Sequence, residues 1–178
     1  GPIYFGNTLY KYKGEMPANT HIDIKEGTTT ICDGAFAGCK SLTSVSIPNS
    51  VTSIENYAFA GCKSLTSISI PNSVTEIGYD AFKGCSSLTS ISIPNSVTEI
   101  GSGAFDATPF LDNQPDGPIY VDNLLYTYKG EMPANTHIDI KKGTTTICDR
   151  AFSDCSSLSS ISIPNSVTEI RGGAFDAT

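Results

Sequence analysis

Apolar and polar positions alternate in short runs along this chain, and the runs return at a regular spacing. In residues 88–105 (LTSISIPNSVTEIGSGAF), Ile91 and Ile93 alternate with serines, which is the two-residue period of a half-buried strand. The Pro-Asn-Ser triplet that follows predicts a turn, because proline fixes φ and asparagine tolerates a bend. Residues 97–100 predict a second extended piece, and the Ala-Phe segment after it is too short for an ordinary helix.

This pattern is one unit of a repeat that covers most of the chain. The isoleucine that closes each alternation recurs every 23 residues, at Ile24, Ile47, Ile70 and Ile93 and again from Ile140 to Ile163. A column of phenylalanines recurs with it, at Phe36, Phe59, Phe82, Phe105, Phe152 and Phe175. One unit of this length cannot bury its own apolar face, so successive units must stack. The sequence therefore predicts a mainly β solenoid, with parallel strands stacked in a right-handed coil and joined by short 3₁₀ or helical turns.

A second, longer repeat interrupts the regular units. Residues 1–33 return almost unchanged as residues 117–149, an offset of 116 positions. A Gly-Asn pair in the first copy and an Asp-Asn pair in the second mark hairpin turns, so we expect β-hairpin insertions. We predict a single domain over residues 1–178, with longer hairpin-containing units at 1–23 and 106–139 and regular 23-residue units at 24–105 and 140–178.

The end of the chain bears on how much of the array is present. Thr178 lies where the earlier copy continues into PFLDNQPDGPIY, and no polar capping repeat closes the array. We therefore expect this chain to be a fragment of a longer array.

Composition and charge exclude several classes of function. The net charge is −7, and an acidic surface repels phosphate backbones, so nucleic acid is not an expected partner. No apolar run approaches the roughly 18 residues of a membrane span, so we expect no membrane insertion. Glu76 and Glu99 lie one unit apart, but stacked units impose that spacing on any repeated residue. With no nucleophile–base pair or metal constellation, we expect neither an enzyme nor a cofactor.

The repeat resembles the leucine-rich repeats of the BspA-like family of bacterial surface proteins. The likeness rests on LTSISIPNSVTEIG followed by AF and GC, and on a longer unit containing NQPDGPIY and YKGEMPANT. It covers essentially the whole chain. It implies a leucine-rich-repeat solenoid that is secreted or held at the cell surface, without catalytic residues. It also implies adhesion through binding to a host or bacterial surface protein or to a glycan.

The outward face of the strands is the first candidate for binding. Its serines are the candidate ligand-binding residues of the regular units, namely Ser67, Ser69, Ser90 and Ser92. They would form a hydroxyl-lined surface for a polar ligand, or they simply suit stacked strands, where hydroxyl pairs stabilise the sheet. Specific protein-binding faces carry aromatic or arginine anchors, and we expect none on the regular units.

The longer unit supplies the larger candidate side chains. They are Tyr10, Tyr12, His21 and Asp23 in the first copy and Tyr126, Tyr128, His137 and Asp139 in the second. Each His-x-Asp pair replaces the usual Ser-x-Ser of the outward strand face, because residues two apart share a face. Such a pair binds a metal or senses pH, or it is merely solvated. The tyrosines either pack on the solenoid or form a stacking platform for a sugar or a partner.

Cysteines form one more column of the repeat, at Cys39, Cys62, Cys85 and Cys155. Stacking brings neighbouring cysteines within disulfide range, but parallel side chains disfavour a bridge. We expect buried free thiols, since cysteine is among the most buried residue types.

Two functions fit these features. One is a binding or adhesion module whose ligand contacts the longer unit, and the other is a structural spacer with no ligand of its own.

Overall fold

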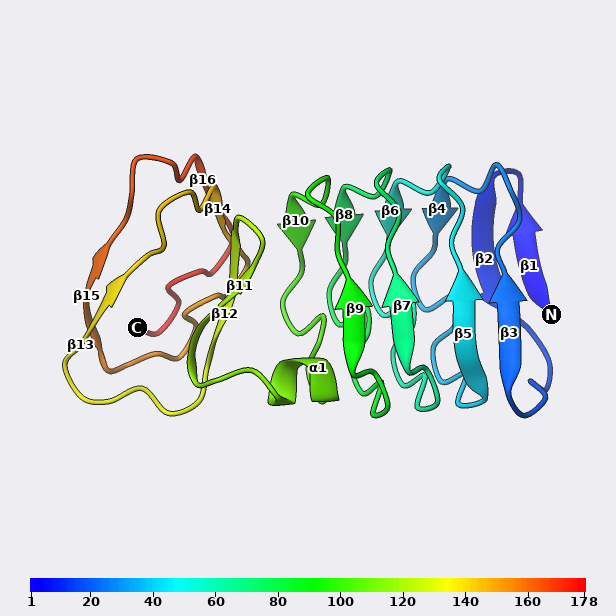
Figure 1. Ribbon diagram of the computed structural model, residues 1–178, viewed down its shortest axis with the longest axis horizontal. Helices are drawn as coiled ribbons and strands as arrows, with labels where there is room; N and C mark the ends of the chain where they lie inside the picture. Colours follow the sequence, from blue (N-terminus) through cyan, green and yellow to red (C-terminus); the bar gives the residue numbers. More distant parts are fainter. The chain divides into compact units, whose positions relative to one another are not determined.

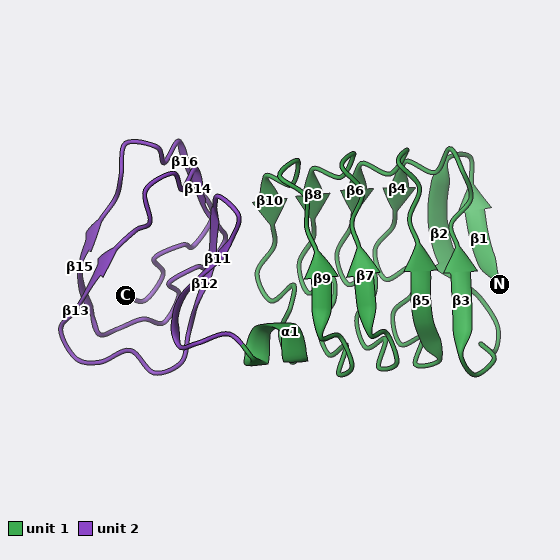
Figure 2. Ribbon diagram, viewed as in Figure 1, with its two compact units in different colours: residues 1–113 green, residues 114–178 purple.

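The computed structural model describes residues 1–178 and forms two compact units, residues 1–113 and residues 114–178 (Figure 2). The boundary between the units falls inside the longer sequence unit predicted at 106–139. Each unit is a mainly β coil of stacked parallel strands with almost no helix, which confirms the predicted fold class. A single domain spanning residues 1–178 stays a prediction.

The first unit begins with a hairpin and continues as regular coils (Figure 1). Its strands are β1 (Pro2–Phe5), β2 (Thr8–Tyr12), β3 (Thr20–Asp23), β4 (Thr30–Ile31), β5 (Leu42–Ser46), β6 (Ser53–Ile54), β7 (Ser67–Ser69), β8 (Glu76–Ile77), β9 (Ser90–Ser92) and β10 (Glu99–Ile100). Strand β1 pairs antiparallel with β2, and one sheet then runs β1-β2-β4-β6-β8-β10. Two parallel pairs, β3-β5 and β7-β9, line the other side of the coils.

The second unit repeats this plan with fewer coils. Its strands are β11 (Gly117–Val121), β12 (Leu124–Lys129), β13 (Thr136–Asp139), β14 (Thr146–Ile147), β15 (Leu158–Ser162) and β16 (Glu169–Ile170). Strands β11 and β12 form the second hairpin, β12-β14-β16 continue in parallel, and β13 pairs in parallel with β15. Both hairpin insertions that the turn pairs predicted are therefore present.

The strand face agrees with the sequence pattern, with one adjustment. Ser46, Ser69 and Ser92 are exposed, as the alternation predicts. Strands β5, β7 and β9 end at these serines, so the isoleucine after each one lies just beyond its strand. Ile70 is buried, and its backbone N–H still donates to the Ser92 carbonyl at 2.9 Å. The proline that follows each isoleucine explains the early end, because it has no N–H to continue the ladder.

Stacked phenylalanines form the centre of each unit. In the first unit the rings of Phe36, Phe59, Phe82 and Phe105 are fully buried and stack with centroids 5.2, 5.3 and 5.9 Å apart. Hydrogen-bonded turns carry these rings; in one of them Cys62 N–H donates to the Phe59 carbonyl at 3.1 Å. Short turns, as predicted, therefore connect the strands of each coil in place of helices.

A single short helix, α1 (Pro109–Asp112), ends the first unit. The Thr108 hydroxyl caps it by accepting a hydrogen bond from Leu111 N–H at 3.3 Å, and proline opens the first turn. No helix of this protein combines the length and apolarity that crossing a bilayer requires.

Candidate functional site

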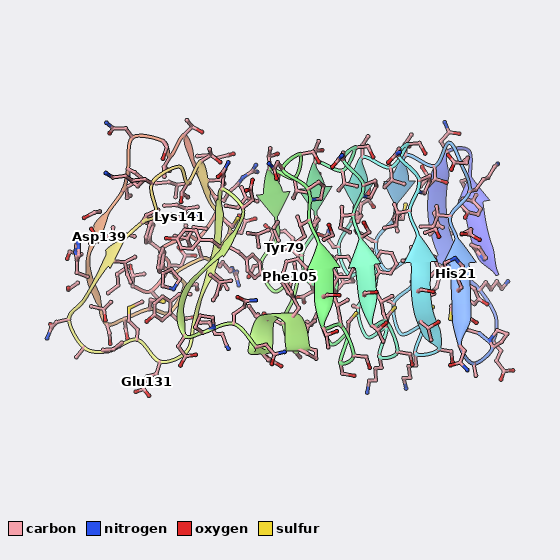
Figure 3. All side chains as sticks on the ribbon, viewed as in Figure 1. His21, Tyr79, Phe105, Glu131, Asp139 and Lys141 are labelled. Carbon is pink, nitrogen blue, oxygen red and sulfur yellow. The ribbon has the colours of Figure 1, made fainter.

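The residues that stand out chemically lie on the first coil of each unit, on the exposed strand face. Strands β3 and β5 pair in parallel, so that His21 faces Ser44 and Asp23 faces Ser46. Figure 3 shows His21 on β3 of the first unit. The His-x-Asp pair therefore occupies the outward position that Ser-x-Ser holds on other coils, as the two-residue period predicts.

These four side chains form one hydrogen-bonded group, here called the His–Asp–Ser cluster. His21 Nδ1 lies 2.6 Å from Ser44 Oγ. His21 Nε2 lies 3.1 Å from Asp23 Oδ1 and 3.2 Å from Ser46 Oγ. The neutral tautomer with hydrogen on Nε2 satisfies this network, because Nε2–H then donates to the carboxylate and Nδ1 accepts from the Ser44 hydroxyl.

The same cluster recurs in the second unit with the same geometry. Strand β13 places His137 opposite Ser160 and Asp139 opposite Ser162. The corresponding distances are 2.6 Å from His137 Nδ1 to Ser160 Oγ, 3.1 Å from Nε2 to Asp139 Oδ1 and 3.2 Å from Nε2 to Ser162 Oγ. Figure 3 marks Asp139 on β13. Two neighbouring coils build each cluster, and neither coil supplies it alone.

Hydrogen bonding stabilises the ionised form of the carboxylate in each cluster. A hydrogen bond from Ser46 lowers the pKa of Asp23 below its ordinary value, and a second one from His21 adds to the effect. In the second unit Ser162 and then His137 lower the pKa of Asp139 in the same way. The surface of each cluster thus offers a fixed negative charge beside an imidazole and two hydroxyls.

The clusters are open to solvent, and each brings together one histidine and one carboxylate. The structure holds no group of three or more histidine, cysteine, aspartate or glutamate side chains placed to bind a metal ion. Three protein ligands are the usual minimum for catalytic zinc. The arrangement suits recognition by hydrogen bonds and charge.

A shallow hollow adjoins the first cluster where β3 and β5 end. Asp23, Lys25, Ser46 and Pro48 are among the residues that line it, and its volume is about 450 Å³. The hairpin fixes one wall, because Lys25 N–H donates to the Tyr4 hydroxyl at 3.1 Å. A ligand on the cluster can therefore extend over both cationic and anionic groups.

The predicted tyrosines of the hairpins divide into two kinds. Tyr12 packs against Phe36 with ring centroids 6.4 Å apart, and Tyr128 packs against Phe152 at 6.2 Å. These two rings extend the phenylalanine columns into the hairpins. Tyr12 and Tyr128 therefore pack on the solenoid, which was the first of the two roles considered for the tyrosines.

The other two predicted tyrosines occupy corresponding positions with different exposure. Tyr10 is 51% exposed and packs edge-on against Phe5, with centroids 5.2 Å apart. Its counterpart Tyr126 is 2% exposed. In the first unit, Tyr10 therefore remains an exposed aromatic side chain and Tyr12 does not.

A second hollow forms where each hairpin strand leads into the loop before the His–Asp–Ser cluster. In the first unit Tyr12, Met16 and Cys39 line a volume of about 390 Å³, and the residues 116 positions later line about 400 Å³ in the second. On regular coils the column cysteines are buried, and Cys62 Sγ donates to the Phe36 carbonyl at 3.2 Å. The cysteines beside the longer unit are only partly buried, since its loop departs from the coil.

The remaining predicted residues form a plain surface. Ser67, Ser69, Ser90 and Ser92 are all exposed on β7 and β9, in register with one another. Because serine side chains are small, this face offers a ligand hydroxyl groups but little surface area to bury.

Sequence analysis missed two exposed aromatic residues on the regular coils. Tyr57 is 50% exposed and Tyr79 is 46% exposed, so the regular coils do carry exposed aromatic side chains, although away from the strand face that was considered for binding. The available signal was that both tyrosines break the repeat just before the Ala-Phe pair. Neighbouring coils have Gly34 and Asp80 at the position of Tyr57, and Asn56 and Ser102 at the position of Tyr79.

Comparison with known proteins places these features in a family. The model of the BspA type leucine rich repeat region matches six copies over residues 8–114 and 126–178. Among curated proteins, none matches the chain significantly.

Two solved structures have a similar fold. One is a leucine-rich repeat protein from Bacteroides ovatus, with a TM-score of 0.55 and 28% identity over 96% of this chain and 39% of its own. The other is the T. pallidum leucine rich repeat protein, with a TM-score of 0.52 and 28% identity over 84% of this chain and 59% of its own. The chain thus spans less than two thirds of either relative.

Proposed function

Because this chain belongs to the BspA-type leucine-rich repeat family, which typically mediates protein interaction, we propose that it is a non-catalytic binding or adhesion module of a secreted or surface-held bacterial protein. Its ligand is a host or bacterial surface protein or a glycan. The binding site is the His–Asp–Ser cluster of each unit.

The observation that carries this proposal is the exact recurrence of an exposed polar cluster. His21 and His137 keep the same partners at the same distances in both units. The fold does not require them, since β7 and β9 pair in the same register with serine at the corresponding positions. A histidine and a carboxylate fixed against two hydroxyls give directional contacts that serine alone does not.

A spacer without a ligand is the second candidate, and the serine face of β7 and β9 favours it. Small hydroxyls in register suit stacked strands without further function. The two candidates differ in whether His21 and His137 contribute to the binding of a ligand.

A binding screen separates these candidates. The chain is tested against glycans and surface proteins, together with a variant carrying both His21→Ala and His137→Ala. A matched control carries Ser67→Ala and Ser90→Ala, which change the same face on regular coils. The proposal expects at least one ligand that the histidine variant loses and the serine control keeps. If every ligand is kept by the histidine variant, the spacer function is the better account.

A further inference from the structure

Two half-exposed tyrosines lie on neighbouring coils of the first unit, away from the strand face. Tyr57 follows strand β6 and Tyr79 follows strand β8. Their backbones meet directly, because Tyr57 N–H donates to the Tyr79 carbonyl at 2.8 Å. Figure 3 marks Tyr79 among the side chains of this unit. The two tyrosines therefore lie side by side along the chain direction of adjacent coils.

The backbone at Tyr57 is of a kind that bulky residues avoid. Its φ is +58°, in the left-handed region, where a β-carbon meets the following carbonyl oxygen. Every coil has a positive φ at this position, which is held by Gly34, Gly103 and Gly173 in three coils and by Asp80 and Arg150 in two others. Glycine adopts this conformation without strain, and burial does not compensate a tyrosine that is half exposed. Tyr57 is the one aromatic residue among those that hold this position, and its ring is half exposed, so the packing of the fold does not explain the choice of tyrosine.

Side chains of adjacent coils hold both tyrosine-bearing turns rigidly in place. Asn56 Oδ1 accepts a hydrogen bond from Tyr79 N–H at 2.8 Å, and Asn56 N–H donates to Asp33 Oδ1 at 2.9 Å. Gly78 makes room for this ladder, since a β-carbon there would lie 2.6 Å from the Asn56 nitrogen. A backbone held in this way places each ring at a defined point, which reduces the conformational entropy that binding costs.

Acidic groups outnumber basic ones around these turns. Lys83 forms an ion pair with Asp80 at 3.1 Å, and its pKa is raised first by that hydrogen bond and also by the charge of Asp106. On the neighbouring coil, Glu55 Oε2 accepts a hydrogen bond from Asp33 N–H at 3.1 Å. These contacts involve four carboxylates and one lysine, and Lys83, which is paired with Asp80, also lies close enough to Tyr57 for the phenol to raise its pKa.

We propose that Tyr57 and Tyr79 form a platform for an extended, arginine-bearing segment of a partner protein. A guanidinium lies over a tyrosine ring, where the ring quadrupole attracts it, and the surrounding carboxylates hold its charge. The platform is separate from the His–Asp–Ser clusters, so this inference does not rest on the proposed function.

The polar groups of the surface favour a cationic peptide over a neutral sugar. Sugar recognition needs free hydrogen-bonding groups beside the aromatic ring. Here Asn56 and Asp33 already bond the backbone of the next coil. The excess negative charge, by contrast, attracts a cation without requiring an unoccupied donor or acceptor.

The test uses a fluorescein-labelled peptide of alternating arginine and serine, with fluorescence anisotropy as the readout. Tyr57→Gly should weaken binding roughly two- to fivefold, which is the size of a cation–π contact at an exposed site. The same variant should keep or raise the thermal unfolding midpoint, because it relieves the left-handed strain. Tyr79→Ser should also weaken binding. Tyr10→Ser is the matched control, since Tyr10 is equally exposed but lies on the hairpin.

Several results would overturn the platform. The first is that the wild-type chain does not bind the arginine peptide, and the second is that Tyr57→Gly binds it as tightly as the wild type. An equal loss in Tyr10→Ser would mean that exposed tyrosines bind the peptide without selectivity. A peptide of alternating glutamate and serine that binds equally well would remove the charge argument.

Discussion

The first coil of each unit and the regular coils beside it have the same strand pairing but carry different side chains on the outward face. Strand β3 pairs with β5 and strand β7 pairs with β9, both in parallel and with outward residues in register. The first pair presents His21 and Asp23, whereas the second presents only serines. Since β7 and β9 pair in the same register with serines, strand pairing does not require the larger side chains, even though His21 hydrogen-bonds both serines of β5. Departures from the repeat, and not the repeat itself, therefore point to function.

The largest expected effect separates the core of the regular coils from their outer face. Phe82→Ala removes a fully buried ring from the stack and should lower the free energy of unfolding by about 3–5 kcal/mol. Ser90→Ala, on the exposed strand face, should change it by less than about 0.5 kcal/mol. Urea denaturation of both variants measures the difference. Equal losses would mean that the division between core and surface is wrong.

Much of this division could be predicted from the sequence. The phenylalanine column and the outward serines follow from the 23-residue periodicity, and the hairpins follow from the Gly-Asn and Asp-Asn turn pairs. The His–Asp pairs were also placed correctly on the outward face. Their serine partners were not predicted, because Ser44 and Ser46 come from the next coil and the contact depends on register between strands.

The exposed tyrosines show where sequence reasoning fails. Nothing in the residue pattern around Tyr57 indicates a left-handed backbone, since only comparison of aligned coils shows glycine at that point. Nor does alternation along β2 separate Tyr10 from Tyr12, whose ring contacts differ because one meets Phe5 and the other the phenylalanine stack. The contact of Tyr12 depends on the neighbouring coil, whereas the contact of Tyr10 lies within the hairpin, and neither follows from the alternation along one strand.

The cysteines of the column differ in burial between the regular coils and the coils beside the longer unit. Cys62 and Cys85 are fully buried, whereas Cys39 and Cys155 are partly exposed beside the longer unit. A maleimide reagent should therefore label the second pair well before the first in the folded protein. Burial raises the pKa of Cys39, so its labelling should accelerate as the pH rises above the usual thiol range. Peptide mass spectrometry over time measures the order, and simultaneous labelling of all four would contradict the assignment.

A smaller effect tests the electrostatics of one cluster against its duplicate. Ser46→Ala removes the hydrogen bond that contributes most to the low pKa of Asp23. Losing a donor to the ionised form raises the pKa, so Asp23 should titrate closer to its ordinary value. Asp139 keeps Ser162 and should be unchanged, which makes it an internal control. Carboxyl carbon chemical shifts followed by NMR report both groups. A shift at both sites, or at neither, would show that the serine does not act as described.

The central claim is that the two clusters are equivalent binding sites, and binding stoichiometry tests it most directly. Isothermal titration of the wild-type chain with a ligand from the screen should give two sites per chain. His21→Ala and His137→Ala should each leave one site of unchanged affinity, and the double variant should leave none. A wild-type stoichiometry that survives in both single variants would contradict the claim, because the ligand would then bind elsewhere on the coils.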